Sequence, residues 1–337
     1  MKILDGGIGR YLKEIGAPFR QPEWSALTLM EDPSSVITAH QAFVDAGAQI
    51  ITTNSYAVVP YHIGEERFKT RGAELIALAG QLAQSVKKSS SQPISVAAGI
   101  PPIFGSYNPD EFVTADAVAL LEVFKQQLLP FTDIVLAETV SSIEEVIAIQ
   151  KVFVDCAQPL WISMTLEDEA EASDSRLRSG ELLSDALSAI NLDQIDAILF
   201  NCSQPEVMAK AVTLSAKRLP SDIDIGVYAN GFTPISNTIQ ANDGYSTLRD
   251  DLTPQDYLVF AQQWKALGAT IIGGCCGTSP DHLRTMVEAL KGYTPRDIPT
   301  KDAIESALGP IAATGPSPHA AGGGDGEGRK RRGRRRS

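Results

Sequence analysis

The feature that most constrains the fold is an eightfold alternation of short apolar segments with amphipathic segments of helical periodicity. Runs such as ISVAA and DAILF are apolar on both faces, which is typical of buried parallel strands. The alternation predicts strands at Lys2–Leu4, Gln49–Thr53, Ser95–Ala98, Ile134–Ala137, Leu160–Thr165, Ala197–Phe200, Ile225–Ala229 and Thr270–Ile272.

Helices are expected between these strands. Apolar residues recur there at spacings of three and four, and Pro205, Pro254 and Pro280 stand where a first helical residue is favoured. The expected helices are Pro33–Ala46, Gly64–Lys88, Ala115–Leu129, Ile143–Val154, Glu181–Ile190, Pro205–Arg218, Pro254–Leu267 and Pro280–Leu290.

Eight strand–helix units predict an α/β fold of the (β/α)8 TIM-barrel type. The main alternative is a doubly wound open sheet, but no Gly-x-Gly-x-x-Gly motif follows any expected strand. Several segments after strands are long, at 101–114, 167–180 and 230–253, whereas most returning segments are short. Because the loops after barrel strands gather at one face, we expect the active site there, with long loops able to close over it.

The chain divides into a barrel over 1–295, a C-terminal extension over 296–313 and a disordered Gly/Pro-rich linker with a basic tail over 314–337. The last nine residues carry seven of the 29 Lys and Arg residues. Without them, 22 basic residues face 41 acidic ones, a net charge of −19. We therefore expect the folded body to repel nucleic acid. The tail is either a polyanion-binding segment or a solvated extension.

Cysteine usage and the N-terminus indicate the compartment. Only four cysteines occur in 337 residues, no apolar run has the length of a membrane span, and MKILDGGIGR lacks the apolar core of a signal peptide. We expect a cytoplasmic protein with no membrane partner. The sequence contains no indication of the oligomeric state.

Polar residues interrupt the apolar runs where six of the expected strands end. In a barrel, the C-terminal ends of all strands lie at one face, so these residues are expected to converge. They are Asp5-Gly6-Gly7, Thr53-Asn54-Ser55-Tyr56, Glu138-Thr139, Asn201-Cys202-Ser203, Asn230-Gly231 and Gly273-Gly274-Cys275-Cys276-Gly277.

Three of the four cysteines, Cys202, Cys275 and Cys276, belong to this ring of strand ends. Three thiolates with an open fourth position are typical of a catalytic zinc site. Neighbouring residues of a regular strand point to opposite faces, so the adjacent pair reaches one ion only if the backbone turns sharply, which the flanking glycines permit. The alternative is a set of buried free cysteines, and that is our interpretation of Cys156.

The histidines point to no acid–base machinery. His282 lies near the cysteine pair but opens the last expected helix, so we do not expect it to be a fourth ligand. A substrate thiol bound to a thiolate-rich zinc loses its proton without a general base, and the resulting nucleophile is suited to alkyl transfer. A hypothesis from another class is a thiol redox protein using Cys275 and Cys276, although that pair lacks the Cys-x-x-Cys spacing.

The order and spacing of Asp-Gly-Gly, Glu-Thr, Asn-Cys and Gly-Gly-Cys-Cys-Gly resemble the homocysteine S-methyltransferase family over roughly residues 1–295. The resemblance implies a zinc (β/α)8 barrel that methylates homocysteine to methionine. It implies Cys202, Cys275 and Cys276 as Zn²⁺ ligands. It also implies that Asp5 and Glu138 bind the homocysteine amino group, and an ammonium does require a charged acceptor.

Further residues of the strand-end ring are expected to contact substrate. Backbone amides of the Gly6-Gly7 and Gly273-Gly274 turns are expected to bind the substrate carboxylate. The remaining expected contacts are Thr139, Asn201 and Asn230.

The resemblance leaves several methyl donors open, because family members use S-methylmethionine or S-adenosylmethionine, betaine, or methyltetrahydrofolate through cobalamin. The length of the chain leaves no room for folate and cobalamin domains, and the extension of the betaine type is absent, so we expect a sulfonium donor. Tyr56, Tyr228 and Phe232 are expected to face its cation. The stretch Ala229-Asn230-Gly231-Phe232 replaces the Pro-Asn-Ser-Gly of many relatives. A betaine-like donor and another thiol or selenol acceptor therefore stay open.

Overall fold

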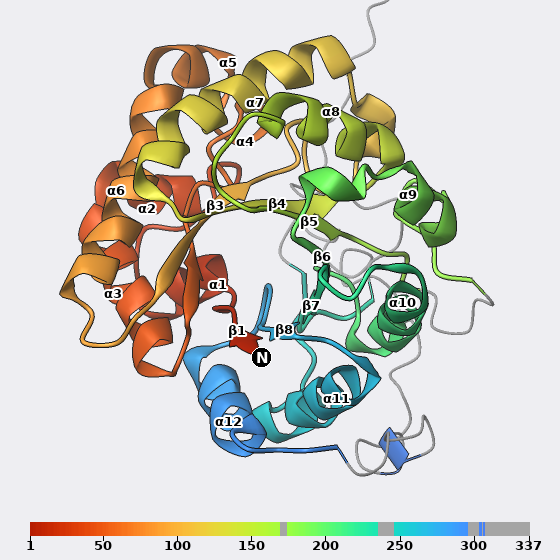
Figure 1. Cartoon of the computed structure of the whole chain (residues 1–337). Coiled ribbons are helices and arrows are strands. Elements are labelled where there is room, and N and C mark those ends of the chain that lie inside the picture. Colours follow the sequence, from red (N-terminus) through yellow and green to blue (C-terminus); the bar gives the residue numbers. More distant parts are fainter. Residues whose placement is uncertain (169–173, 235–245, 296–302, 305, 307–337) are drawn as a thin grey trace, which may run out of the picture.

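The computed structural model describes residues 1–168, 174–234, 246–295, 303–304 and 306. Eight parallel strands form a barrel surrounded by helices (Figure 1), which confirms the predicted (β/α)8 fold. The strands are β1 (Lys2–Ile3), β2 (Ile50–Thr52), β3 (Ser95–Ile100), β4 (Ile134–Val140), β5 (Leu160–Met164), β6 (Ala197–Asn201), β7 (Asp224–Tyr228) and β8 (Ile271–Ile272).

The barrel closes between its first two strands. The continuous sheet has the order β1-β8-β7-β6-β5-β4-β3-β2 with all neighbours parallel. A parallel bridge between Leu4 and Ile50 joins its two edges. The Asp5 amide donates to the Ile50 carbonyl oxygen (3.0 Å), and the Gln49 amide donates to the Ile3 carbonyl oxygen (2.9 Å). Closure therefore places Asp5 beside the end of β2.

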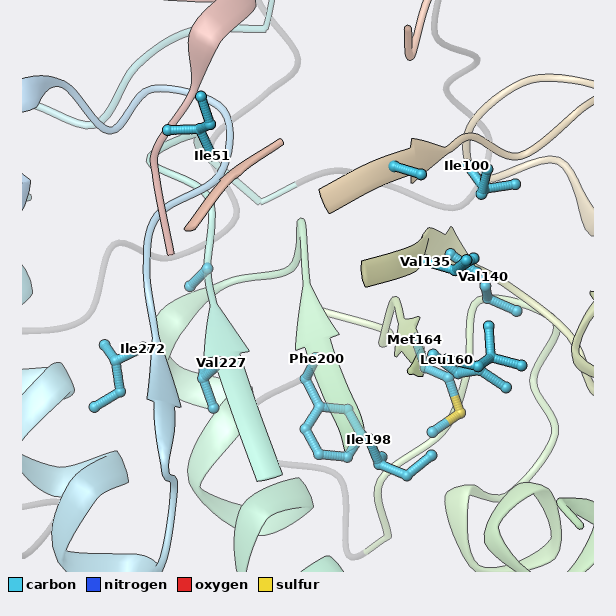
Figure 2. Close-up of a cluster of buried hydrophobic side chains, with 14 of the residues drawn as sticks. Ile51, Ile100, Val135, Val140, Leu160, Met164, Ile198, Phe200, Val227 and Ile272 are labelled. Atoms are coloured by element: carbon cyan, nitrogen blue, oxygen red, sulfur yellow. The ribbon is translucent and has the colours of Figure 1, made fainter. Parts of the chain in front are cut away.

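Alternate strand residues face two different cores, as the period of two in a β-strand requires. Residues that face the helices form the larger apolar cluster, part of which Figure 2 shows around β2 to β8. Residues that face the barrel interior form a smaller cluster: Leu4, Ile50, Ala97, Ile134, Leu136, Trp161, Ala197, Leu199, Tyr228 and Ile271. The interior is thus a packed core rather than a pore.

Helices cover the outside of the barrel, and Pro205, Pro254 and Pro280 occupy first helical positions as predicted. No helix among the described residues is long and apolar enough to cross a membrane. The helices are α1 (Ile8–Glu14), α2 (Ser25–Glu31), α3 (Pro33–Asp45), α4 (Pro60–Ile63), α5 (Glu65–Arg67), α6 (Ala73–Ser89), α7 (Thr114–Leu128), α8 (Ile143–Phe153), α9 (Leu183–Ala189), α10 (Pro205–Arg218), α11 (Pro254–Leu267) and α12 (Pro280–Leu290).

The helical prediction was incomplete between β1 and α3. That segment contains α1 and α2, which are each seven residues long and too short to show a clear amphipathic period. The helix expected over 64–88 is present, as α5, a π-helical turn at Phe68–Gly72 and α6, which follow one another without a break. The two missed helices matter for the site, because α1 begins directly after Asp5-Gly6-Gly7.

The expected C-terminal extension and tail lie almost entirely outside the described residues. Within the extension, Ile304 is buried in the larger apolar cluster. All residues of the expected tail, 314–337, lie outside the described ranges.

A buried carboxyl group caps α8. The Glu145 amide donates to Ser142 Oγ (3.2 Å), while Glu145 Oε2 accepts from the Ser141 amide (3.0 Å). Burial raises the pKa of Glu145 from an ordinary value of 4.5 to about 7, against the lowering effect of the Ser141 and Ser142 hydrogen bonds. Between these two values the folded protein holds a proton that the unfolded chain has lost, so stability falls as the pH rises through this window.

We expect Glu145→Gln to retain the cap and to remove this loss of stability. Relative to the wild type, the variant should gain up to about 3 kcal/mol in the free energy of unfolding between pH 5 and pH 8. Urea unfolding at the two pH values measures the gain. Glu144→Gln, at an exposed position one residue earlier, is the matched control and should show a much smaller gain. An equal gain in both variants would contradict the assignment.

Candidate metal centre

Three cysteine sulfurs converge at the C-terminal mouth of the barrel. Cys202 Sγ lies 3.1 Å from Cys275 Sγ and 3.9 Å from Cys276 Sγ. All three sulfurs lie within 4.8 Å of one another. Cys156, predicted as an ordinary core residue, is outside this cluster and partly buried. The convergence of three sulfurs on one point favours a metal centre over a redox pair formed by Cys275 and Cys276 alone.

A sharp turn brings the adjacent cysteines to the same side. The Thr278 amide donates to the Cys275 carbonyl oxygen (3.1 Å), and Gly277 has a φ of 85°, which favours glycine. The Gly274 amide is held by the Asp5 carbonyl oxygen (2.9 Å). A Cβ atom at Gly274 would lie 2.0 Å from Thr278 Oγ1, so only glycine fits there. The predicted role of the glycines around the pair is thereby confirmed.

Cys202 reaches the same point from β6 through a left-handed backbone conformation. Its φ is 51°, which is strained for a residue with a side chain, and its amide donates to the Tyr228 carbonyl oxygen (3.3 Å). Such conformations persist where the surrounding structure holds them, often at functional sites. Here the strain directs the Cys202 thiol toward the two cysteines that follow β8.

The three thiols fit a divalent soft metal ion. Zinc–sulfur bonds of about 2.3 Å in a tetrahedral site would separate the sulfurs by about 3.8 Å, close to the 3.9 Å between Cys202 and Cys276 and longer than the 3.1 Å between Cys202 and Cys275. Hydrogen bonds from Cys202 and Cys275 lower the pKa of Cys276, while the pKa values of Cys202 and Cys275 are raised. The cluster alone therefore favours one thiolate, and a cation would be required to hold three.

Among the described residues, no histidine joins the cluster. His282 Nδ1 lies 2.9 Å from Ser279 Oγ and accepts from the Ser279 amide (3.2 Å). Its Nε2 lies 3.1 Å from the Leu252 carbonyl oxygen. Both ring nitrogens are thus engaged at the start of α12, in agreement with the expectation that His282 is not a ligand.

Two carboxyl groups, Asp5 and Glu138, lie beside the cysteines. Asp5 Oδ2 accepts from the Thr52 amide (2.7 Å) and Oδ1 from the Thr52 hydroxyl (3.1 Å), and burial raises the pKa of Asp5 to about 7. Burial, together with the nearby negative charges of Asp5 and Cys202, raises the pKa of Glu138 to about 8. The structure therefore gathers the two predicted carboxyl groups and the cysteines into one site.

Asn201 and Thr139, both predicted to contact substrate, are hydrogen-bonded to each other. Asn201 Oδ1 accepts from the Thr139 amide (3.0 Å) and the Ser163 hydroxyl (2.8 Å), while its Nδ2 donates to Thr139 Oγ1 (2.9 Å). Thr139 has a φ of 58°, and the β4–β5 register shifts here. These bonds fix the end of β4, so both residues have a positioning role next to Glu138.

Asn230, another predicted substrate contact, lies fully buried between the ends of β6 and β8. Its amide donates to the Ser203 carbonyl oxygen (3.1 Å), and its Oδ1 accepts from the Phe232 amide (3.2 Å). Its Nδ2 has no hydrogen-bond partner among the described residues. Burying an N–H donor without a hydrogen bond costs free energy, and an acceptor atom of a bound ligand would remove that cost.

The expectation that the glycine turns bind a substrate carboxylate is wrong for three of their four amides. The Gly7 amide donates to the Thr278 carbonyl oxygen (3.0 Å). The amides of Gly273 and Gly274 donate to the carbonyl oxygens of Val227 (3.0 Å) and Asp5 (2.9 Å). These bonds tie β1, β7 and the cysteine turn together, so the amides serve the fold.

A polar network that was not predicted from the sequence lies behind Cys202. The Tyr107 hydroxyl donates to the Cys202 carbonyl oxygen (3.1 Å), and the Arg178 guanidinium lies over the Tyr107 ring, 4.9 Å from its centroid. Arg178 pairs with Asp168 (2.9 Å), whose other oxygen accepts from the Gln204 amide (2.9 Å). The long loops after β3 and β5 are thereby fastened to the end of β6.

The same network extends to the loop after β7 through Arg249. Its Nη1 donates to Gln204 Oε1 (2.9 Å) and pairs with Glu206 (2.7 Å), while its Nη2 pairs with Asp251 (2.7 Å). Tyr107, Asp168, Arg178, Arg249 and Asp251 lie in the long post-strand loops, which was a sequence signal for them, whereas Gln204 and Glu206 lie at the start of α10. Their pairing depends on the arrangement of three loops in space, which no local spacing reveals.

Two of the three aromatic residues expected to face a cation adjoin the cysteines. Burial, and then the charge of Cys202, raises the pKa of Tyr56, whose hydroxyl lies 2.7 Å from Ser106 Oγ. Burial, and then the charge of Glu138, raises the pKa of Tyr228. The Phe232 ring instead carries the guanidinium of Arg10, 5.1 Å from its centroid.

Comparisons with known proteins show the family of the chain. A family model described as homocysteine S-methyltransferase matches residues 2–290. Homocysteine S-methyltransferase 1 of Zea mays is 26% identical over 318 residues, covering 87% of this chain and 95% of that protein. Homocysteine S-methyltransferase 1 of Arabidopsis thaliana is 27% identical over 315 residues, covering 86% and 93%.

A solved structure shares the fold. The crystal structure of the metallated form of the homocysteine methyltransferase MmuM from Escherichia coli has a TM-score of 0.69 and 23% identity. The similarity covers 86% of this chain and 96% of that protein. Together with the family match over nearly all of the barrel, the strand-end residues show that the chain belongs to the homocysteine S-methyltransferase family.

Proposed function

We propose that the protein transfers a methyl group from a sulfonium donor, S-methylmethionine or S-adenosylmethionine, to the thiol of L-homocysteine, with Zn²⁺ bound by Cys202, Cys275 and Cys276. The observation that supports this proposal most strongly is the convergence of three cysteine sulfurs beside two carboxyl groups, that of the buried Asp5 and that of the partly buried Glu138. The names of the relatives support the acceptor, and the metallated form of MmuM supports a metal.

The cysteines supply three of four positions around the ion. Zinc, when bound, would hold the homocysteine sulfur as a thiolate nucleophile. The absence of a histidine base among the described residues of this site is compatible with that chemistry, because no protein group then needs to remove the thiol proton.

The carboxyl groups would bind the acceptor's ammonium. Asp5 is held in place by Thr52, and the Asn201–Thr139 pair fixes the end of β4 beside Glu138. Burying two neighbouring carboxylates is costly, and an ammonium ion placed between them would offset that cost. Asn230 Nδ2 offers an additional neutral donor to the bound ligands.

The donor would lie against Tyr56 and Tyr228, whose rings adjoin the cysteines. Aromatic faces attract onium cations, which supports a sulfonium donor. In the transfer, the thiolate sulfur forms a bond to the methyl carbon while the donor's sulfur–carbon bond breaks. The electron pair of the broken bond neutralises the sulfonium, so two neutral thioethers result and no proton moves.

Methionine formation from homocysteine tests the proposal directly. Each donor in turn, S-methylmethionine, S-adenosylmethionine and betaine, is supplied with and without a chelator. We expect methionine with at least one sulfonium donor and a loss of activity as the chelator removes zinc. Activity with betaine alone would favour the betaine-like alternative, and full activity in zinc-free protein would refute the mechanism.

Substitution of a single cysteine of the cluster should remove the metal. We expect the wild type to contain about one zinc per chain, and Cys275→Ala to lose most of it together with methyl transfer, because two thiolates bind zinc weakly. Zinc analysis by mass spectrometry and the methionine assay measure both. Cys156→Ala is the matched control and should keep metal and activity. If Cys156→Ala lost zinc and Cys275→Ala did not, the ligand assignment would be wrong.

Asp5→Asn and Glu138→Gln should weaken recognition of the ammonium without loss of zinc. Each is expected to raise the KM for homocysteine about 10- to 100-fold, because a hydrogen-bonded charge pair is lost. With 4-sulfanylbutanoate as the acceptor, which lacks the amino group, the variants should have the same KM as the wild type. Glu144→Gln provides a control at an exposed carboxylate. Equal losses with both acceptors would indicate a structural role instead.

A further inference from the structure

Arg10 is a charged residue at the edge of the metal centre that the proposed chemistry does not yet use. It lies on α1, five residues after Asp5, and it is partly exposed. The start of α1 is pressed against the cysteine turn, since a Cβ atom at Gly7 would lie 2.5 Å from the Cys275 carbonyl oxygen. The helix therefore carries Arg10 close to the site.

The guanidinium of Arg10 contacts two residues that follow β7, Phe232 and Ser246. It lies 5.1 Å from the centroid of the Phe232 ring, and its Nη2 donates to the Ser246 carbonyl oxygen (2.6 Å). The residue before Phe232, Gly231, donates its amide to the Cys276 carbonyl oxygen (2.7 Å). The positive charge is thus placed on the segment after β7 that is bonded to the cysteine turn.

The charges of the site leave one substrate group without a partner. An amino-acid substrate brings an ammonium and a carboxylate, and Asp5 and Glu138 provide only negative charge. The amides of Gly7, Gly273 and Gly274, the expected carboxylate donors, are already used by the backbone. Arg178 and Arg249, which also lie near the site, are buried inside the network behind Cys202, where Arg178 pairs with Asp168 and Arg249 with Glu206 and Asp251.

We infer that Arg10 binds the carboxylate of an amino-acid substrate, and so selects substrates that carry one. The inference rests on the proposed function and deepens it. A guanidinium presents a planar fork of N–H donors that matches a carboxylate, and its stacking on Phe232 and its bond to Ser246 limit its freedom before binding. The carboxylate belongs to either of two sources, the acceptor homocysteine or the amino-acid part of the sulfonium donor.

Decarboxylated analogues separate the two sources. The acceptor arm compares homocysteine with 3-aminopropanethiol, and the donor arm compares S-methylmethionine with (3-aminopropyl)dimethylsulfonium. In the arm whose natural substrate has its carboxylate bound by Arg10, Arg10→Gln should lower kcat/KM for that substrate about 10- to 100-fold. The kcat/KM for the decarboxylated analogue should stay unchanged. Arg10→Lys should lie between the two, because it keeps the charge but loses the fork.

Controls distinguish recognition from structure. Lys13→Gln removes a charge from an exposed position of the same helix and should leave kcat/KM unchanged in both arms. Arg10→Gln should retain the zinc content and the thermal midpoint of the wild type. If Arg10→Gln lowers kcat/KM equally for natural substrates and analogues, or lowers neither, Arg10 does not recognise a carboxylate.

Binding measurements keep this inference separate from the proposed reaction. Calorimetry on the zinc-loaded protein measures the affinity for homocysteine, 3-aminopropanethiol and each sulfonium compound without turnover. If the wild type binds these ligands but forms no methionine, the proposed reaction is contradicted. The role of Arg10 is then tested by comparing the ligand affinities of the wild type and Arg10→Gln. An Arg10→Gln variant with unchanged affinity for every carboxylated ligand overturns the inference, whatever the activity.

Discussion

Adjacent side chains at the end of a strand point to opposite faces unless the backbone turns between them, and the whole site depends on such a turn at Cys275–Thr278. Hydrogen bonds to Asp5 and from Gly231 hold this turn against the ends of β1 and β7. The same bonds position Asp5, Asn230 and the start of α1. The three cysteines, Asp5 and Arg10 are therefore parts of one backbone arrangement.

The second constraint is charge. Three thiols and two carboxyl groups are collected in one site, and burial and mutual repulsion oppose the ionisation of all of them except the Cys276 thiol. The ionised form of such a site is therefore stabilised by cations. A zinc ion, an ammonium group and an onium donor each supply a positive charge, so one site would bind all three.

The strand positions, the barrel and the three cysteines were predictable because each leaves a local signal: apolar runs, proline starts and a rare Gly-Gly-Cys-Cys-Gly motif. The bonding of Asn201 to Thr139 and the network around Gln204 were not, because they join residues 36 to 62 positions apart. Helix α1 was missed because seven residues show no clear period. With it, Arg10 was missed, since a single arginine has no signal until its surroundings are known.

The distribution of positive groups also bears on how the reaction would proceed. A thiolate and a sulfonium lose their charges as the methyl group moves, so a site with little water favours the transition state over the charged reactants. Such a site must anchor each substrate through groups whose charges persist throughout. Asp5 and Glu138 can do so for an ammonium and Arg10 for a carboxylate, because neither substrate group changes charge in the transfer. Most of the binding energy would then come from the unreactive end of the amino acid, and the sulfur would stay free to react. The thioether product is neutral, so it would be only a weak ligand of the metal.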